Sequence, residues 1–205
     1  MQPQRSDEWY ADRLGRATAS RVGDVMSVIR SGEAAKRRNY RAELVAERLT
    51  GIRIEGFTSS AMQWGIDTEP LARLYYAKHT GEIVQETGFH KLDDLMAGAS
   101  PDGLINEDGG VEFKCPETAT HIETLKTNKV PTMYLWQVDG GLWITGRKWW
   151  DFVSFDPRLP ENARFIRIRV ERNEQRIANL EAGVRQFLAE VDAEEQFVKN
   201  YGGQQ

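Results

Sequence analysis

The stretch GASPDGLINEDGGVEFKCP, residues 98–116, decides the fold because it joins turn signals to a short charged strand. The tripeptide PDG at 101–103 and the run NEDGG at 106–110 are both typical of tight turns. The residues that follow, VEFKC at 111–115, alternate apolar and charged side chains, which predicts a strand. We therefore expect a β-hairpin whose two strands flank the NEDGG turn.

The predicted hairpin brings two carboxylates together beside a lysine. Successive side chains of a strand point to opposite faces, which places Glu112 and Lys114 together on one face. The opposite face is apolar and is formed by Val111, Phe113 and Cys115. The turn would set Asp102 beside Glu112, where two carboxylates repel unless a cation lies between them.

Two interpretations of this hairpin stay open on spacing alone. Mg²⁺ is held by one or two carboxylates together with water and phosphate oxygens, and a lysine nearby would polarise the attacking water. These are the needs of phosphodiester hydrolysis. The other interpretation is a surface hairpin, because Glu and Lys are common on the solvent face of a strand and short motifs often match by accident.

The composition is that of a globular protein. The chain has 205 residues, of which 40% are hydrophobic and 28% charged, enough for one domain with a real core. It contains no apolar run of about 18 residues and no signal-peptide stretch at its start, so we expect a soluble, cytoplasmic protein. A single cysteine, Cys115, excludes an internal disulfide and a cysteine-rich zinc or iron–sulfur site within one chain.

Charge is distributed unevenly along the sequence. The net charge is −4, which argues against a protein that simply coats nucleic acid. Residues 1–50 nevertheless hold ten basic and seven acidic residues, so positive charge gathers near the N-terminus. On charge alone, the simpler interpretation is a solvated face and a mobile loop at 30–39.

The order of predicted elements indicates an α/β domain in which a central mixed β-sheet is flanked by helices. We expect a single domain over 1–205, with N-terminal helices over 1–81, a sheet core over about 82–172 and a C-terminal helix over 173–199. Helices are expected at 6–29 (two, split at Gly15, with Thr18 or Ser20 as a cap), 38–50, 58–81, 117–128, 131–146 and 173–199, and strands at 82–104, 111–115, 149–157 and 164–170. Pro70 should kink the helix at 58–81 or start a new one.

Pro101-Asp102 followed by Glu112-Phe113-Lys114 resembles the signature of the PD-(D/E)xK nucleases. Four other segments, in the same order, resemble the phage lambda exonuclease or YqaJ-like alkaline exonuclease family of that superfamily: RLGRATASRV at 13–22, MQWGIDTEPLARLYY at 62–76, YLWQVDGGLWITG at 134–146 and FVSFDPRL at 152–159. The resemblance covers nearly the whole chain. It implies the restriction-endonuclease-like fold and a 5′→3′ exonuclease that digests one strand of linear duplex DNA and leaves 3′ overhangs.

The resemblance also implies partners and a cofactor. These are two Mg²⁺ ions per site, for which Mn²⁺ would substitute, a ring-shaped homotrimer, a single-strand annealing protein and a phage or prophage origin in a bacterial host. Carried over by motif, the catalytic and metal-binding set is Asp102, Glu112, the backbone carbonyl of Phe113, Lys114 for the attacking water, Glu69 and, beside the nucleophile, Gln137. The DNA-binding set is Arg13, Ser20 and Ser100 for the 5′-phosphate, Arg30 for downstream DNA and Met62 as an apolar wedge.

Elementary chemistry supports part of this transfer. Ser20 near a helix N-terminus offers a hydroxyl and backbone N–H groups to an anion, and Arg13 could add a bidentate grip, although Ser20 would equally serve as a cap. Pro70 directly after Glu69 steers that residue from helical geometry, which would aim Glu69 differently. Two alternatives remain: a structure- or sequence-specific endonuclease of the same superfamily, and a catalytically silent protein that binds DNA ends.

Overall fold

The computed structural model describes residues 4–56 and 59–202. Its helices are α1 Asp7–Arg13, α2 Val22–Val25, α3 Ala35–Thr50, α4 Ser60–Thr80, α5 Thr118–Thr127, α6 Thr132–Thr145 and α7 Glu174–Lys199, with short 3₁₀ helices at Ala19–Arg21 (η1) and Glu161–Ala163 (η2). Its strands are β1 Ala17–Thr18, β2 His90–Lys91, β3 Ala97–Ala99, β4 Gly103–Ile105, β5 Gly109–Lys114, β6 Trp149–Phe155 and β7 Phe165–Glu171. Within the described residues no helix is long and apolar enough to cross a membrane.

The strands form two mixed sheets, where the sequence predicted one central sheet. The larger has the order β4-β5-β6-β7, with β5 and β6 parallel and the other pairs antiparallel. The smaller has the order β1-β3-β2. The chain passes from β3 to β4 through Pro101, which has no N–H to donate to a ladder, and the two sheets separate at this point.

The larger sheet is covered on both faces, which explains why nearly all of β6 is buried. Ala72 and Tyr76 of α4 pack on the β5 face that carries Val111. Val138 and Leu142 of α6 pack on the opposite face, with Trp150 and Phe152 of β6. Glu112 pairs in register with Phe152 and so lies on the α6 side, while α4 lies on the other.

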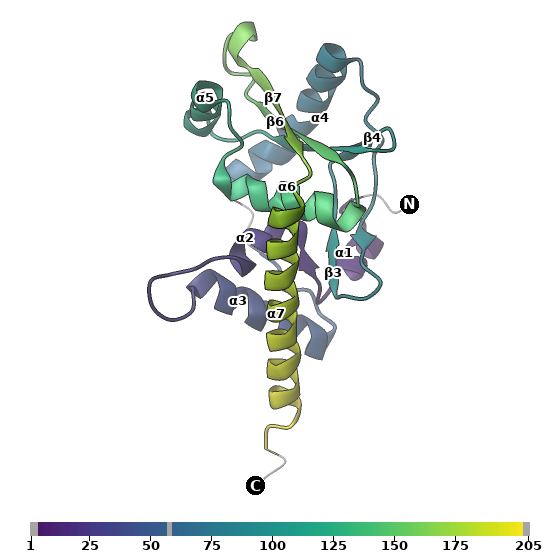
Figure 1. Ribbon diagram of the computed structural model, residues 1–205, viewed down its shortest axis with the longest axis vertical. Coiled ribbons are helices and arrows are strands. Elements are labelled where there is room, and N and C mark those ends of the chain that lie inside the picture. Colours follow the sequence, from purple (N-terminus) through teal and green to yellow (C-terminus); the bar gives the residue numbers. More distant parts are fainter. Residues whose placement is uncertain (1–3, 57–58, 203–205) are drawn as a thin grey trace.

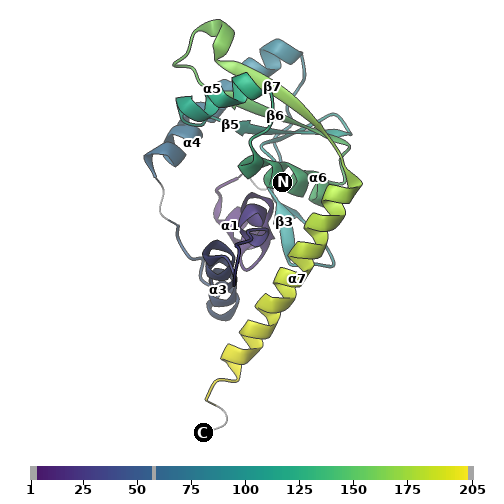
Figure 2. The same ribbon diagram turned by 60° about the vertical axis from the view of Figure 1, so that its left-hand side comes forward.

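The molecule has two halves that meet at α6. The larger sheet lies with α4 and α5 in one half, and α1, α2 and α3 lie in the other (Figures 1 and 2). Helix α7 starts beside α6, packs along α3 and continues beyond the other elements towards the C-terminus (Figure 2). All six residues on its expected inner face are buried: Ile177, Leu180, Val184, Phe187, Leu188 and Val191.

The N-terminal segment differs from the expected pair of helices. Helix α1 is present and Gly15 takes a positive φ of 67°, as a split there requires. The prediction of a second helix here is wrong for the most part, because Ala17 and Thr18 pair with β3 and only one helical turn, α2, follows η1. Long-range strand pairing overrides local helix propensity here. Thr18 lies at the N-cap position of η1 but makes no capping hydrogen bond.

Two other helix boundaries are corrected. Helix α3 begins at Ala35, three residues earlier than expected, because the run AAKRR is itself a good helix former. Helix α4 is one helix through Pro70, so the expectation of a new helix at the proline is wrong. The side chain of Ser59 caps α4 by accepting from Met62 N–H, while Thr58 lies outside the described residues.

Candidate active site

The β4–β5 hairpin delivers Asp102 to Glu112 and the strand that carries it. Gly103 pairs with Val111, so Asp102 stands one residue beyond the ladder, next to β5. The backbone N–H of Phe113 donates to Asp102 Oδ2 at 2.7 Å and fixes that carboxylate. The turn chemistry predicted from the sequence is therefore the device that holds Asp102 over the charged strand.

Glu112 collects two donors on one oxygen. Lys114 Nζ donates to Glu112 Oε1 at 2.7 Å, and Gln137 Nε2 of α6 donates to the same oxygen at 2.5 Å. The lysine also lies 5.4 Å from the ring centroid of Tyr134, the residue three positions before Gln137 on α6. Strand alternation places Glu112 and Lys114 as predicted, with Phe113 in the core behind them.

Burial and mutual repulsion dominate the electrostatics of this cluster. Burial, and then the charge of Glu112, raises the pKa of Asp102 well above its usual range. Burial likewise raises the pKa of Glu112, against the opposing charge of Lys114. Burial alone would lower the pKa of Lys114, but the two carboxylates outweigh it and raise that pKa. Lys114 is thus a fixed cation beside two carboxylates, and its single positive charge does not neutralise both of them.

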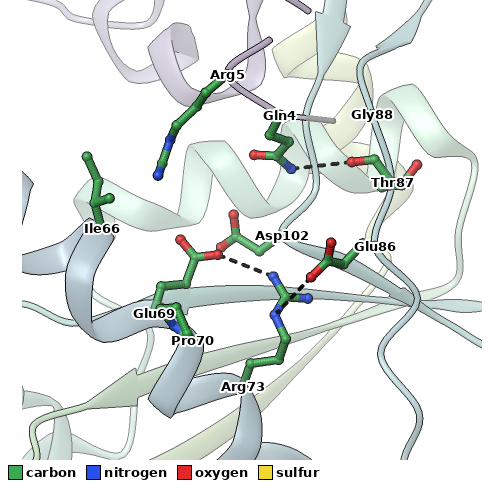
Figure 3. A pocket seen from close by; sticks show the side chains of 10 residues that line it. All are labelled: Gln4, Arg5, Ile66, Glu69, Pro70, Arg73, Glu86, Thr87, Gly88 and Asp102. Atoms are coloured by element: carbon green, nitrogen blue, oxygen red, sulfur yellow. Dashed lines mark hydrogen bonds and ion pairs between the residues drawn. The ribbon is translucent and has the colours of Figure 1, made fainter. Parts of the chain in front are cut away.

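Glu69 joins the cluster from α4. Its carboxylate lies beside Asp102 (Figure 3), and burial, followed by the charge of Asp102, raises its pKa. Arg73, one turn later on the same helix, donates to Glu69 Oε1 at 3.3 Å. Because α4 continues through Pro70, the proline does not turn Glu69 away from the site.

A second group of side chains forms next to the carboxylates. Arg13 Nη1 and Trp9 Nε1 both donate to Ser100 Oγ, at 3.1 and 2.9 Å. The Arg13 guanidinium stacks on the Trp9 ring, 4.1 Å from its centroid, and burial lowers the pKa of Arg13. Ser20 faces the same small cavity as Arg13, Ser100, Glu112 and Gln137. Arg13 and Ser100 therefore line the same small cavity as the carboxylate of Glu112.

One cavity of about 610 Å³ unites nearly all the residues singled out from the sequence. Its lining includes Asp102, Glu112, Phe113, Lys114, Glu69, Gln137, Arg13, Ser20, Ser100 and Met62. Met62 is 57% exposed at this cavity. Arg30 does not line it; that residue is exposed in the loop between α2 and α3, apart from the other candidates.

The donors fit a hard cation. No group of three or more Asp, Glu, His or Cys side chains forms a ready-made metal cage among the residues described. Mg²⁺ needs no such cage, because it keeps several waters and binds one or two carboxylates. Glu112 supplies a buried carboxylate and Asp102 a half-buried one, a divalent cation would relieve their repulsion, and Glu69 adds a third carboxylate beside Asp102.

The structure adds three polar residues that the sequence reasoning missed. Trp9 holds Ser100, and its spacing of four residues from Arg13 on α1 was a usable signal. Arg73 stands four residues after Glu69 on α4, which is again a helical pair. Gln4 donates to the carbonyl of Pro101 at 2.7 Å, a contact across 97 residues for which the sequence carried no signal.

Known proteins resemble this chain over its length. The sequence model of the YqaJ-like viral recombinase domain matches residues 8–148. The crystal structure of an alkaline exonuclease (LHK-Exo) from Laribacter hongkongensis has a TM-score of 0.90 and 46% identity, covering 97% of this chain and 99% of that one. A second structure of that enzyme is in complex with dAMP.

Two further proteins resemble this chain at lower sequence identity or over a shorter segment. A phage-related exonuclease from Haemophilus somnus 129PT shares the fold, with a TM-score of 0.70 at 12% identity over 90% of this chain and 96% of its own. The putative uncharacterized protein ExoD of Escherichia coli (strain K12) is 29% identical over 63 residues, 31% of this chain and 71% of that protein. The expected family and PD-(D/E)xK-type fold are confirmed by the family match and the LHK-Exo structure. The chain therefore belongs to the YqaJ-like viral recombinase family of nucleases.

Proposed function

We propose that the protein is a Mg²⁺-dependent 5′→3′ exonuclease that digests one strand of linear duplex DNA from 5′-phosphorylated ends and leaves 3′ overhangs. The observation that carries the proposal is the shared cavity, in which the Arg13–Ser100 group adjoins Asp102, Glu112 and Lys114. An anion site beside hydrolytic residues is what a nuclease that reads a terminal phosphate needs. An endonuclease of the same superfamily would not need a site for a terminal 5′-phosphate.

The roles follow from the contacts. Asp102, Glu112, Glu69 and the Phe113 carbonyl would hold Mg²⁺, which supplies charge stabilisation for the attacking and leaving oxygens. Lys114, fixed by Glu112, would orient the attacking water and offset the developing negative charge. Gln137 holds the same carboxylate from α6 and keeps it in place beside the nucleophile.

The terminal phosphate would bind at Arg13, Ser20 and Ser100. Trp9 limits the motion of Arg13 by stacking and positions Ser100 by its own hydrogen bond, so the guanidinium is preorganised for a bidentate anion. Arg30 would contact downstream DNA and Met62 would help part the strands. LHK-Exo has been crystallised with dAMP, and its likeness to this chain supports a mononucleotide product here.

Three substrates test the proposal: a 5′-phosphorylated linear duplex, the same duplex with 5′-hydroxyl ends, and closed circular DNA, each with Mg²⁺. We expect mononucleotides from the first, much slower release from the second and no cutting of the circle. Arg13→Gln should reduce the rate on the phosphorylated duplex to that on the hydroxyl duplex. Equal cutting of the circle would refute the exonuclease assignment, and discrete fragments would favour the endonuclease alternative.

The assembly and setting are also proposals. We place the protein in the bacterial cytoplasm as a phage or prophage product that forms a homotrimeric ring and hands 3′ overhangs to a single-strand annealing protein. The far end of α7 supports self-association, because Phe197 in its last turn and Tyr201 just beyond it are 66% and 77% exposed. Light scattering should return the mass of three chains, and Phe197→Ser should lower it.

A further inference from the structure

A second charged cavity lies on the other side of the carboxylates from the Arg13–Ser100 group. It has a volume of about 360 Å³ and contains Asp102 and Glu69 in one wall (Figure 3). Arg5 and Arg73 line it as well, together with Gln4 and Glu86. The small cavity of Arg13, Ser20 and Ser100 instead reaches Glu112. The carboxylates thus stand between two arginine-bearing cavities.

Arg5 is the arginine of this second cavity whose donors are free. Arg5 makes no hydrogen bond or ion pair within residues 4–56 and 59–202, and its guanidinium points into the cavity (Figure 3). Arg73 donates to Glu69, and its Nη1 is buried against the sheet near Gly103, so it adds positive charge to the cavity wall but offers no free donor to a ligand.

The acidic residues of the cavity do not cancel the positive charge of its arginines once a substrate complex forms. Glu86 is 81% exposed and lies 3.9 Å from Arg73 Nε, so solvent weakens its charge. Asp102 and Glu69 belong to the proposed cation site, where their charge is shared with Mg²⁺. The Arg5 guanidinium then faces an incoming ligand directly, and the charge of Arg73 lies behind it in the wall.

The geometry points to this cavity as the subsite for the DNA phosphate that follows the scissile phosphate in the 3′ direction. The inference rests on the proposed function, because that function puts the terminal 5′-phosphate at Arg13 and the scissile phosphate at the carboxylates. A strand that passes from Arg13 across Glu112 and Asp102 next reaches Arg5 and Arg73. Guanidinium groups suit phosphate because they donate from a planar fork.

The test pairs a substrate change with a protein change. The substrates are 5′-phosphorylated duplexes with a single neutral methylphosphonate either between the second and third nucleotides or between the sixth and seventh. Release of the first nucleotide is measured in single turnover for wild type, Arg5→Gln and Arg38→Gln. Arg38 is an exposed arginine outside this cavity and makes a matched control.

We expect the nearer methylphosphonate to slow the wild type by about tenfold or more, the worth of one charge-assisted hydrogen bond. Arg5→Gln should slow release from the unmodified duplex to a similar extent and lose most of its sensitivity to the nearer modification. The farther modification should act equally on all three proteins. The subsite would be refuted if the nearer modification slowed Arg5→Gln by the same factor as wild type, so that the two effects multiplied. It would also be refuted if the nearer modification left the wild-type rate unchanged. A wild type inactive on the unmodified duplex would instead overturn the proposed function itself.

Discussion

Lys114→Ala should abolish cleavage while leaving duplex binding intact. Lys114 Nζ donates to Glu112 Oε1 at 2.7 Å and is the cation that the nearby buried carboxylates share. Loss of one preorganised donor at a developing charge costs about 10²–10³ in rate. Because the substitution also removes the charge that offsets Asp102 and Glu112, we expect a loss of at least about 10³.

The assay measures single-turnover release from a 5′-phosphorylated duplex with Mg²⁺, and binding by fluorescence anisotropy with Ca²⁺ in its place. Removing one partner of a buried ion pair also costs about 3–5 kcal/mol of stability, so the midpoint of unfolding must be recorded for each variant. Lys114→Gln keeps a polar group beside Glu112 and serves if the alanine variant unfolds. Lys129→Ala, an exposed lysine, is the control. A folded Lys114→Ala protein within tenfold of the wild-type rate would refute the assigned role.

The remaining predictions concern stability and the metal. Burial alone would raise the pKa of Asp156, but hydrogen bonds from Arg158 and Thr118 lower it from 3.8 to about 2. Urea unfolding at pH 7 should therefore show Asp156→Asn less stable by about 2 kcal/mol, a difference that is complete above the unfolded pKa and vanishes as pH falls through the folded one. Tyr76→Phe removes a hydroxyl that donates to buried Asp151 at 2.7 Å and should cost about 1–2 kcal/mol by the same measurement. EDTA should stop cleavage and excess Mg²⁺ restore it, whereas cleavage that persists in EDTA would contradict the metal requirement.

The β4–β5 hairpin of the candidate site could be predicted from the sequence because every signal in it is local. The turn residues, the alternation and the short loop all lie within residues 98–116, and together they place Asp102 opposite the charged strand. The inner face of α7 was equally accessible, because a period of 3.6 over 26 residues has no competing interpretation. The hairpin and the inner face of α7 are both determined by residues close together in the sequence.

Contacts between distant segments could not be predicted by the same means. The hydrogen bond from Arg13 to Ser100 spans 87 residues, and only the family resemblance placed these two residues together. Strand β1 was missed because two residues carry too little periodicity, and pairing with β3 decides their conformation. The split into two sheets was missed for a related reason, since Pro101 marks a turn in sequence but the separation of β3 from β4 is a property of the whole fold.

The positive charge near the N-terminus shows why a charge count alone misleads. Arg37 and Arg41 bind Glu190 of α7, and Arg48 binds Asp192, so these arginines fasten α3 to α7. They are neither a solvated face nor a footprint for DNA. Arg5 and Arg13, by contrast, make no ion pair within the described chain, and both line the cavity of the candidate active site. Positive charge placed at a cavity attracts a DNA backbone to that cavity even when the protein as a whole is net acidic.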